Sequence, residues 1–420
     1  MTNLSCSIFT PTHNTKHLLE LYHSIQKQDY LEWVIFVNHG PSPEDIPSEI
    51  REDPRTKVVT NEYVSDNIGA IKKFACSQCT GQILIECDHD DEILPGIIDK
   101  IKEAFQDPEV VFAYTDCAEY NDDQTRSVRM YDAAYGWEYY DLQHEGYTYK
   151  VAVTPDAIPA HASIVLFQAN HVRAFRRSTY ERIGGHDMAL DVLDDQDLTC
   201  RLYVEGKFKH IKECGYLYRV HQDGSNTWLK RNAKIQEDMV TLQEKYIEPM
   251  AMRWSKEQGL RCLDLGGRIG CPEGYESLDH KDADVECDLE EEWPILDDSV
   301  GIIRAHDIIE HLHDTIHFFK EASRVLVPGG YIFISVPSTD DGGRGAFQDP
   351  LHVKFFNINS FFYYTRAAQA RYIDTPVRFQ RIILKNYYPS QWEIDNKIPY
   401  VKAVLLNLKG GYHSHGLIEI

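Results

Sequence analysis

The chain has 420 residues, with 66 acidic side chains against 43 basic ones, so its formal net charge is −23. Hydrophobic residues make up 43% and charged residues 26%, as in a soluble globular protein of two or three domains. This composition excludes disordered and fibrous classes. The negative field disfavours nucleic acid and anionic lipid as partners.

The first residues lack a basic segment followed by a long apolar one, and no stretch reaches the roughly 18 consecutive apolar residues of a membrane span. We therefore expect a cytosolic (cytoplasmic) protein without an integral membrane segment. The ten cysteines then predict reduced thiols. Cys76 and Cys79 form one CxxC, which fits a redox pair or half of a zinc site, but no second CxxC completes a cage, and structural thiols are favoured.

Four apolar runs in the first hundred residues predict strands, and each is followed by a polar or acidic loop. These runs are Cys6–Phe9, Trp33–Val37, Val58–Val59 and Ile83–Ile85. The first is followed by the loop Thr10–Asn14 and then by helical spacing at Leu18, Leu21 and Ile25. Strands that alternate with helices predict an α/β unit with a mostly parallel, doubly wound sheet, whose ligands bind at the carboxyl ends of the strands.

Two later segments predict the domain organisation. Residues from about Tyr120 to Pro159 are rich in Tyr and Asp without a clear period, which predicts an irregular insertion able to shape an acceptor pocket. The spacing of Ile235, Met239 and Leu242 predicts an amphipathic helix. We expect a first domain at 1–228, this linker helix at 229–258 and a second domain at 259–420.

At Cys262–Leu265 the pattern of strand and Gly-rich loop starts again, with the loop at Gly266–Gly270. Further strands are expected up to Asp279 and at Val300–Ile303, Tyr331–Val336, Phe379–Leu384 and Val401–Leu408. The second domain is therefore also predicted to be α/β, with an antiparallel pair closing its sheet.

Five acids fall within the seven positions Glu86–Glu92, directly after a predicted strand. Such a cluster repels itself unless a cation or proton intervenes, and carboxylates suit Mg²⁺ or Mn²⁺. An EF-hand is excluded, because the sixth position counted from Asp88 is Ile93, where Gly is needed. The alternative is an acidic surface turn that caps the next helix.

A second acidic cluster, Asp194-Asp195-Gln196-Asp197, follows Gly184-Gly185-His186-Asp187. A partly buried carboxylate near other carboxylates has a raised proton affinity, which suits a general base. Acids at a helix N-terminus that stabilise the helix through its dipole are an equally good interpretation of this cluster alone.

Together and in this order, the motifs of the first 230 residues resemble the family-two glycosyltransferases of the GT-A fold. The resemblance rests on Thr10-Pro11-Thr12-His13-Asn14, Asn67-x-Gly69, Asp88-His89-Asp90-Asp91, Gly184-Gly185-His186-Asp187 and Asp194-Asp195 with Leu198. It implies an inverting transfer of a sugar from a nucleotide-sugar donor to a glycan or lipid-linked acceptor.

The resemblance also implies residue roles. Thr10, Pro11, Asn67 and Asp88 would face the donor nucleotide, and Asp88 and Asp90 would hold Mn²⁺ or Mg²⁺. Asp195, beside Asp194, would be the base. His221 stands where related enzymes often carry a histidine near the metal, although a lone histidine is more often structural. The second strand ends at Asn38-His39, where the family usually has an acid that reads the nucleobase, so the base is not indicated.

The second half resembles the class I S-adenosylmethionine-dependent methyltransferases, a Rossmann-like fold. The resemblance rests on the Gly-rich loop, Asp279, Asp288-Leu289, the run Ile303 to Leu312, Arg324 to Gly330, and Gly345-Ala346-Phe347-Gln348-Asp349-Pro350-x-His352. It implies that Gly266, Gly267, Asp279 and Asp288 bind S-adenosylmethionine. Arg268 stands where the family commonly has a second glycine, so it could crowd the cofactor or pair with its carboxylate.

Histidines in the second half have two interpretations. His311, His313 and His317 suggest a zinc site, because His313 and His317 would lie one helical turn apart. No third ligand is evident near that pair, so histidines on a helix surface are favoured. His311 and His352 are candidate bases for a methyl acceptor. The alternatives for the whole chain are a glycosyltransferase with a non-catalytic methyltransferase-like module, a glycan-binding scaffold with both sites inactive, and a nucleotidyltransferase, which the lack of a basic Gly-rich loop near the N-terminus disfavours.

Overall fold

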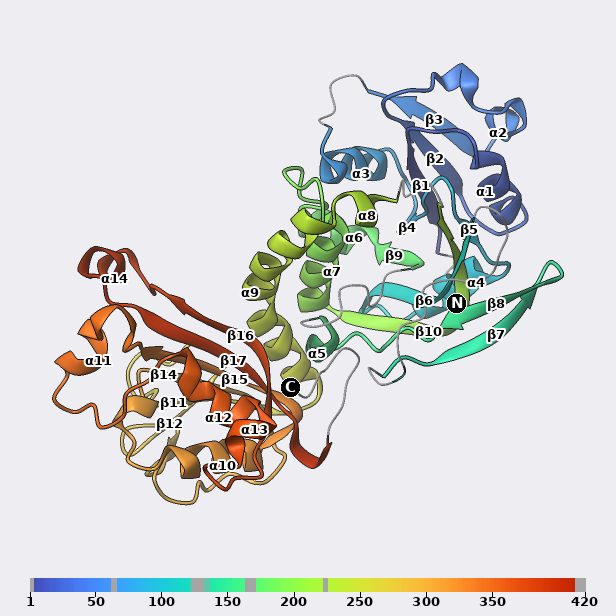
Figure 1. Ribbon diagram of the computed structural model, residues 1–420. Coiled ribbons are helices and arrows are strands. Elements are labelled where there is room, and N and C mark those ends of the chain that lie inside the picture. Colours follow the sequence, from blue (N-terminus) through green and yellow to red (C-terminus); the bar gives the residue numbers. More distant parts are fainter. Residues whose placement is uncertain are drawn as a thin grey trace. The chain divides into compact units, whose positions relative to one another are not determined.

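The computed structural model of the protein describes residues 4–61, 66–121, 133, 136–162, 171–221 and 226–411. The chain divides into two compact units (Figure 1), one formed by residues 1–157 and 165–246, the other by 158–164 and 247–420. The limits 228 and 258 expected from the sequence lie near the two ends of helix α9 (Asn232–Glu257), whereas the units divide within that helix.

The sheet of the first unit has ten strands in the order β3-β2-β1-β4-β9-β6-β10-β5, with the hairpin β7–β8 joined through β6. Its parallel half consists of β3 (Thr56–Thr60), β2 (Glu32–Val37), β1 (Cys6–Thr12) and β4 (Ile83–Glu86). The other half consists of β9 (Arg173–Arg176), β6 (Val110–Asn121), β10 (Lys207–Val220) and β5 (Glu92–Ile93). Because β9 runs antiparallel to both β4 and β6, the sheet is mixed, not mostly parallel as expected.

Strand β1 is longer than the sequence predicted. Its residues Thr10, Pro11 and Thr12, expected in a loop, pair with Ile35, Phe36 and Val37 of β2. Proline lacks an N–H, but the pairing of β1 with β4 has already ended at Phe9, so no second ladder needs that donor. The polar residues of this motif are therefore held by the sheet.

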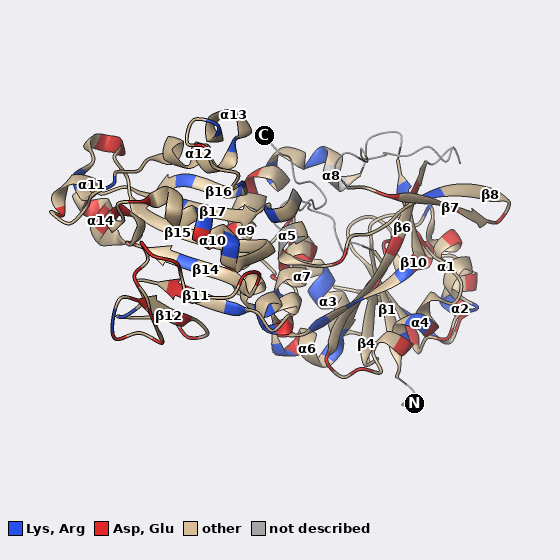
Figure 2. Ribbon diagram, turned by 90° about the horizontal axis from the view of Figure 1, so that it is seen from below, with Lys and Arg blue, Asp and Glu red and all other residues tan. Residues whose placement is uncertain are grey.

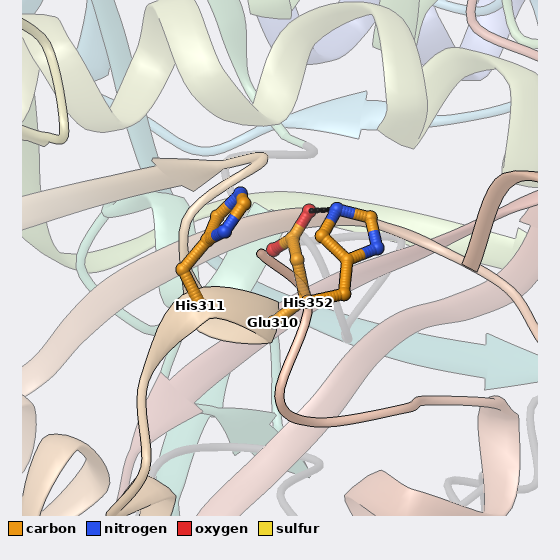
Figure 3. Close-up of side chains that lie close together, drawn as sticks. All are labelled: Glu310, His311 and His352. Atoms are coloured by element: carbon orange, nitrogen blue, oxygen red, sulfur yellow. Dashed lines mark ion pairs between the residues drawn. The ribbon is translucent and has the colours of Figure 1, made fainter. Parts of the chain in front are cut away.

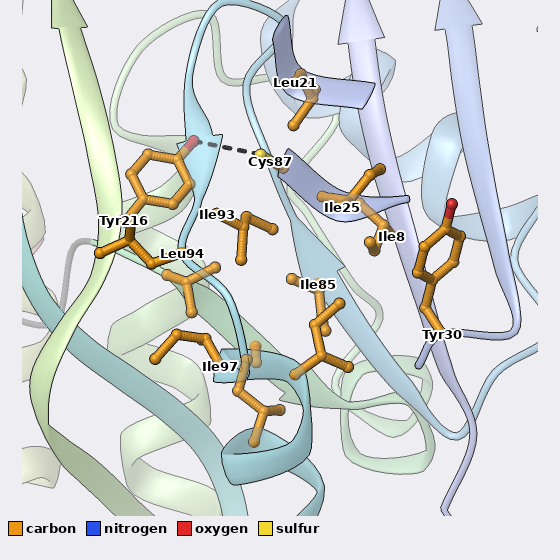
Figure 4. Close-up of a cluster of buried hydrophobic side chains, with 14 of the residues drawn as sticks. Ile8, Leu21, Ile25, Tyr30, Ile85, Cys87, Ile93, Leu94, Ile97 and Tyr216 are labelled. Carbon is orange, nitrogen blue, oxygen red and sulfur yellow. Dashed lines mark hydrogen bonds between the residues drawn. The ribbon is translucent and has the colours of Figure 1, made fainter. Parts of the chain in front are cut away.

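Helices cover both faces of this sheet because successive strand residues point to opposite sides. Ile8 and Ile35 join a core with α1 (Leu18–Ile25) and α4 (Ile97–Ala104), while Phe9 and Phe36 face α3 (Ile68–Ser77) and α7 (Asp194–Glu205). Figure 4 shows the first core reaching Cys87, whose Sγ lies 3.7 Å from the Tyr216 hydroxyl. The acidic turn that follows Cys87 thus rests on a rigid apolar base. The shorter helices of the unit are α2 (Ser48–Glu52), α6 (Arg177–Arg182) and α8 (Thr227–Lys230).

The insertion expected to be irregular contains a regular hairpin, β7 (Tyr139–His144) and β8 (Tyr147–Ala152). The two turn residues, Glu145 and Gly146, have φ of 49° and 80°, the left-handed conformation that a tight hairpin turn requires. These two turn residues are the sequence signal for the hairpin, and the sequence-based prediction missed it. Residues 122–132 and 134–135 of the insertion lie outside the described residues.

The cysteines are all free, as the sequence predicted. Cys76 and Cys79 are buried, and burial raises the pKa of the Cys76 thiol well above its usual value and that of Cys79 to about 12. Neutral, buried thiols are poor nucleophiles and metal ligands, which supports the structural interpretation of the CxxC.

The sheet of the second unit has the order β13-β12-β11-β14-β15-β17-β16. Its strands are β11 (Arg261–Leu265), β12 (Glu276–Asp279), β13 (Val285–Glu286), β14 (Val300–His306), β15 (Leu326–Pro337), β16 (Phe379–Tyr387) and β17 (Tyr400–Asn407). The first five in this order pair in parallel, and β17 is antiparallel to both β15 and β16, which confirms the expected closing pair.

Two apolar layers enclose this sheet. Leu263, Ile303 and Ile334 pack with α10 (Thr315–Val325) on one face, and Ile302 and Phe333 pack with the second half of α9 on the other. The remaining helices are α5 (Pro159–Ala162), α11 (Arg344–Gln348), α12 (Phe362–Thr365), α13 (Ala367–Ala370) and α14 (Gln391–Asn396).

Charged residues of both signs are spread over the two units, as Figure 2 shows for the described residues. No helix among these residues is both long enough and apolar enough to cross a membrane.

Candidate functional site

The first unit contains a cavity of about 650 Å³ at the carboxyl ends of β1 and β4. Segments far apart in the chain line it, and both predicted acidic clusters contribute. The acidic lining residues are Asp88, Asp90, Glu119, Asp194 and Asp195. From the hairpin region, Trp137, Tyr139, Lys150, Ala152 and Thr154 complete the wall.

Strand β10 fixes the acidic turn after β4. The Tyr216 hydroxyl accepts the backbone N–H of Asp88 at 3.1 Å, and the Arg219 backbone N–H donates to Asp91 Oδ1 at 2.7 Å. The Arg219 guanidinium also donates to the carbonyl oxygen of Asp90 at 2.8 Å. With two backbone groups and the Asp91 carboxylate held in this way, the turn presents the side chains of Asp88 and Asp90 to the cavity.

The donor set at this turn fits a divalent cation. His221 Nε2 donates to Asp90 Oδ2 at 2.6 Å, and the Asp88 side chain is 36% exposed. Burial works to raise the pKa of Asp90, but the hydrogen bond from His221 and the charge of His89 outweigh it and lower that pKa. Asp91 Oδ2 is buried and has no hydrogen-bond partner. A nearby cation would reduce the free-energy cost of burying this oxygen. Carboxylate ligands suit Mn²⁺ or Mg²⁺.

Asp194 and Asp195 begin α7, after Leu193 in the left-handed conformation (φ 60°). Asp194 is 4% exposed and its Oδ2 lies 2.8 Å from Lys72 Nζ. Burial, opposed by Lys72, raises the pKa of Asp194 to about 6. Asp195 is more open, with 22% of its side chain exposed, so of the two it is better placed to meet a substrate.

Two cations that sequence reasoning missed tie the acidic clusters together. Arg173 NH1 lies 2.5 Å from Asp195 Oδ2, and its NH2 lies 3.1 Å from Glu86 Oε1 and 3.9 Å from Asp88 Oδ2. Lys72 Nζ lies 2.9 Å from Glu86 Oε1, on the same carboxylate. The charges of Arg173 and Lys72 overcome the effect of burial and lower the pKa of Glu86. The sequence signal that could have revealed Lys72 is a lysine on the buried face of the predicted helix α3.

The other residues predicted to bind the donor nucleotide do not all line the cavity. Pro11 lines the cavity, but Thr10 is buried and its hydroxyl accepts the Trp33 indole N–H at 3.0 Å. Thr10 therefore braces the sheet instead of contacting a ligand. The Asn67 amide donates to the carbonyls of Met188 at 3.1 Å and Ala189 at 3.3 Å, which secures the loop before α7.

In the second unit, the predicted cofactor loop follows β11. Gly266 has φ of +72°, and a Cβ there would lie 2.8 Å from the Ile308 side chain; a Cβ on Gly267 would lie 2.5 Å from Asp264 Oδ2. Only glycine fits such close approaches, and the resulting bare backbone can meet a ligand closely. Asp264 is anchored by Arg304 at 2.7 Å.

The acids expected to bind the cofactor follow β12. Asp279 Oδ1 accepts from His280 Nδ1 at 2.5 Å, and Asp288 Oδ1 accepts the Glu290 backbone N–H at 2.9 Å. Arg268, at the position where a second glycine was expected, is exposed. The loop and Asp279 thus fit an adenosyl cofactor.

The histidines divide into two groups. His311 lies in the short turn Ile309–His311 and meets His352, with ring centroids 4.9 Å apart and the buried Glu310 beside them. His313 precedes α10 instead of lying on it, and its Nδ1 lies 3.0 Å from Glu290 Oε1. His317 Nε2 donates to the Glu291 carbonyl at 2.9 Å. The expectation of helix-surface histidines therefore holds for His317 on α10 and is wrong for His311 and His313, because α10 starts only at Thr315.

Two folded α/β units, each with polar side chains gathered at the carboxyl edge of its sheet, define a two-domain α/β class of protein. Residues 7–183 match the family model described as "Glycosyl transferase family 2", and residues 273–334 match the one described as "Methyltransferase domain". The chain thus matches a family 2 glycosyltransferase model almost entirely within its first unit and a methyltransferase model within its second.

Curated relatives match short segments. A probable S-adenosylmethionine-dependent methyltransferase of Mycolicibacterium smegmatis is 38% identical over 68 residues, 16% of this chain and 26% of that protein. A Campylobacter jejuni GalNAc(5)-diNAcBac-PP-undecaprenol beta-1,3-glucosyltransferase is 29% identical over 102 residues, 23% of this chain and 33% of that protein. The chain therefore spans only a quarter to a third of the length of these relatives.

Solved structures resemble the chain distantly. S. aureus TarS 1–349 in complex with UDP-GlcNAc has a TM-score of 0.44 at 14% identity, covering 61% of this chain and 72% of that one. The mannosyltransferase PcManGT from Pyrobaculum calidifontis, in complex with GDP-Man and Mn²⁺, has a TM-score of 0.40 at 18% identity, covering 57% and 63%.

Proposed function

We propose that the first unit is an inverting glycosyltransferase that moves a sugar from a nucleotide-sugar donor to a hydroxyl of a glycan or lipid-linked saccharide. The observation that carries this proposal is the cavity of about 650 Å³, in which two acidic clusters a hundred residues apart lie on one wall and are joined by Arg173. The match to the family 2 glycosyltransferase model supports it.

In this proposal, Asp88 and Asp90 would hold Mn²⁺ or Mg²⁺, and His221 would join them as a ligand once its Nε2 gives up the proton that it donates to Asp90. The ion would neutralise charge on the leaving nucleoside diphosphate. Pro11 contacts the nucleotide at the end of β1. Asp195 takes the proton of the acceptor hydroxyl as its oxygen bonds to the anomeric carbon, and the bond to the diphosphate breaks with its electron pair leaving on the phosphate oxygen. Its Oδ2 accepts from Arg173 and its Oδ1 from the Gln196 N–H, and each oxygen keeps a second lone pair.

The acceptor would enter past the hairpin. Trp137 and Tyr139 offer aromatic faces and Lys150 a cation on the wall that this hairpin supplies. Sugars stack on aromatic rings through their apolar faces, and a cation suits the phosphate of a lipid-linked saccharide. The curated Campylobacter jejuni relative is named for such an undecaprenol-linked acceptor, which is consistent with a role in surface polysaccharide or glycoconjugate biosynthesis.

We further propose that the second unit binds S-adenosylmethionine through Gly266, Gly267, Asp279 and Asp288 and methylates a sugar hydroxyl of the first unit's product. The methyltransferase match covers Asp279 and Asp288 and extends to β15. His311 and His352 lie at the same edge of the sheet, on the acceptor side of this reaction. Two activities in one chain raise the local concentration of the first product for the second step.

The glycosyltransferase proposal is tested with the full chain, Mn²⁺ and a panel of UDP-, GDP- and dTDP-sugars, following nucleoside diphosphate release. We expect release from one donor, and a decrease of about 100-fold or more in Asp195→Asn and in Asp90→Ala. Asp99→Asn, an exposed acid on α4, is the matched control and should keep wild-type release.

Two results would contradict the proposal: release unchanged in both site variants, or no metal-dependent binding of any donor. The second reaction is tested by transfer of a labelled methyl group from S-adenosylmethionine to the product. Cofactor binding that is lost in Asp279→Ala but never leads to transfer would instead favour a non-catalytic module.

A further inference from the structure

Three side chains with metal-binding atoms meet at the carboxyl edge of the second sheet. Glu310 and His311 belong to the turn after β14, and His352 comes from the segment after α11. One ligand atom from each residue lies within 4.8 Å of the other two. Figure 3 shows the Glu310 carboxyl with an imidazole on either side.

The Glu310 carboxyl is buried without a hydrogen-bond partner. Its side chain is 2% exposed, and neither carboxylate oxygen is hydrogen-bonded. His352 Nε2 lies 3.9 Å from Glu310 Oε1, which is too far for a hydrogen bond. A buried carboxyl without a partner is costly, so this position is expected to carry a function that compensates for the cost.

Both imidazoles are oriented as metal ligands are. His311 Nδ1 lies 3.2 Å from the Leu351 carbonyl oxygen, and His352 Nδ1 lies 2.8 Å from the Ala346 carbonyl oxygen. A carbonyl only accepts hydrogen bonds, so each Nδ1 carries the proton and each neutral ring keeps its lone pair on Nε2. Metal-binding histidines typically donate their second nitrogen to a carbonyl or carboxylate in this way.

The backbone holds the two segments together. The N–H groups of Val353 and Lys354 both donate to the Glu310 carbonyl oxygen at 2.9 Å, and the His352 N–H donates to the Asp349 carbonyl at 3.2 Å. The Gln348-Asp349-Pro350-x-His352 motif therefore places His352 beside Glu310 through main-chain contacts, which do not depend on a ligand being bound.

We propose that Glu310, His311 and His352 form a site for one divalent transition-metal ion, with Zn²⁺ as the best-matched cation. Two imidazoles and one carboxylate are a ligand set of zinc sites that keep a fourth position for water or a substrate oxygen. Ligand atoms around tetrahedral zinc lie about 3.3 Å apart for bonds of about 2.0–2.1 Å, so the side chains need to converge by roughly 1 Å. The ion would offset the buried charge of Glu310, and the two histidines would then be ligands instead of free bases.

This site is distinguishable from the metal site of the first unit. The test uses full-length protein carrying Asp90→Ala, stripped with a chelator and titrated with Zn²⁺ against a chromophoric competitor, and with Co²⁺ as a spectroscopic probe. We expect one equivalent of tightly bound Zn²⁺ and the intense visible absorption of a tetrahedral Co²⁺ site. Glu310→Gln and His352→Ala should each weaken binding by at least about 100-fold.

His313→Ala is the matched control, because His313 is a neighbouring histidine that pairs with Glu290 and should leave Zn²⁺ affinity unchanged. Circular dichroism of the metal-free variants checks that each is folded. The proposal is overturned if the stripped Asp90→Ala protein binds no Zn²⁺, or if Glu310→Gln and His352→Ala, both folded, bind it as tightly as the parent. Methyl transfer that needs His352 without any bound metal would assign the histidines as bases.

Discussion

The candidate sites of the two units differ in how they compensate buried carboxylates. In the first unit, Lys72 Nζ lies 2.9 Å from Glu86 and 2.8 Å from Asp194, and Arg173 adds a second cation. In the second unit, Glu310 is equally buried, but among the described residues its carboxylate accepts no hydrogen bond, and the neutral His352 Nε2 lies 3.9 Å away. One site contains its own counter-charges, and the other contains a carboxyl without one.

This difference shows which site has its buried charges compensated as soon as the protein is folded. A buried ion pair with both partners present is tolerated, whereas a single buried charge is strongly destabilising. The first site can therefore hold its acids in position before any substrate arrives. The second site needs a proton or an external cation, so its ligand state should control the stability of its unit.

The largest expected effect comes from removing the central cation of the first site. Lys72→Met leaves Glu86 and Asp194 buried without Lys72, and we expect a loss of about 3–5 kcal/mol in the free energy of unfolding of the first unit. Denaturant unfolding followed by fluorescence measures it. Lys73→Met, the neighbour on the same helix, should change stability by less than about 1 kcal/mol. Equal effects of the two variants would show that Lys72 does not compensate these carboxylates.

The second prediction has the opposite sign. In metal-free protein, Glu310→Gln removes a buried ionisable group without a partner, so we expect a gain of about 1–2 kcal/mol in the stability of the second unit. Thermal unfolding in the presence of a chelator measures it. A destabilisation as large as that of Lys72→Met would mean that Glu310 already has a compensating partner, and the contrast between the sites would disappear.

The third prediction is a pH dependence of the first unit, whose effect is small over any one pH unit. Folding raises the pKa of Asp194 from 3.8 to about 6, mainly through burial, so between these values the folded state binds more protons than the unfolded one. Stability from this group therefore falls as pH rises from 4 to 6, by at most about 1.4 kcal/mol per pH unit. Asp194→Asn should flatten the slope of melting temperature against pH in this range, whereas Asp99→Asn should not. An unchanged slope in Asp194→Asn would mean that another group takes up this proton.

Local pattern allowed much of the fold to be predicted. Apolar runs located β2 and β4 nearly to the residue, and the restart at Cys262 located β11, because a strand that is buried on both faces has a continuous run of apolar residues. The hairpin β7–β8 was missed because its signal lies in two turn residues instead of a hydrophobic period. Strand β9 was missed because its sequence, Arg-Ala-Phe-Arg, has a charged residue at each end and no apolar run like that of β4.

The sequence by itself determined the two α/β units, the acidic turn at Asp88 and Asp90, the acids at the start of α7 and the glycines of the cofactor loop, because each depends on residues close together in the chain. Only the tertiary structure decided which distant groups meet. Arg173 between Asp88 and Asp195, Lys72 between Glu86 and Asp194, and His352 beside Glu310 are contacts across long stretches of chain. The packing of helices and strands sets these contacts, and no local period records them.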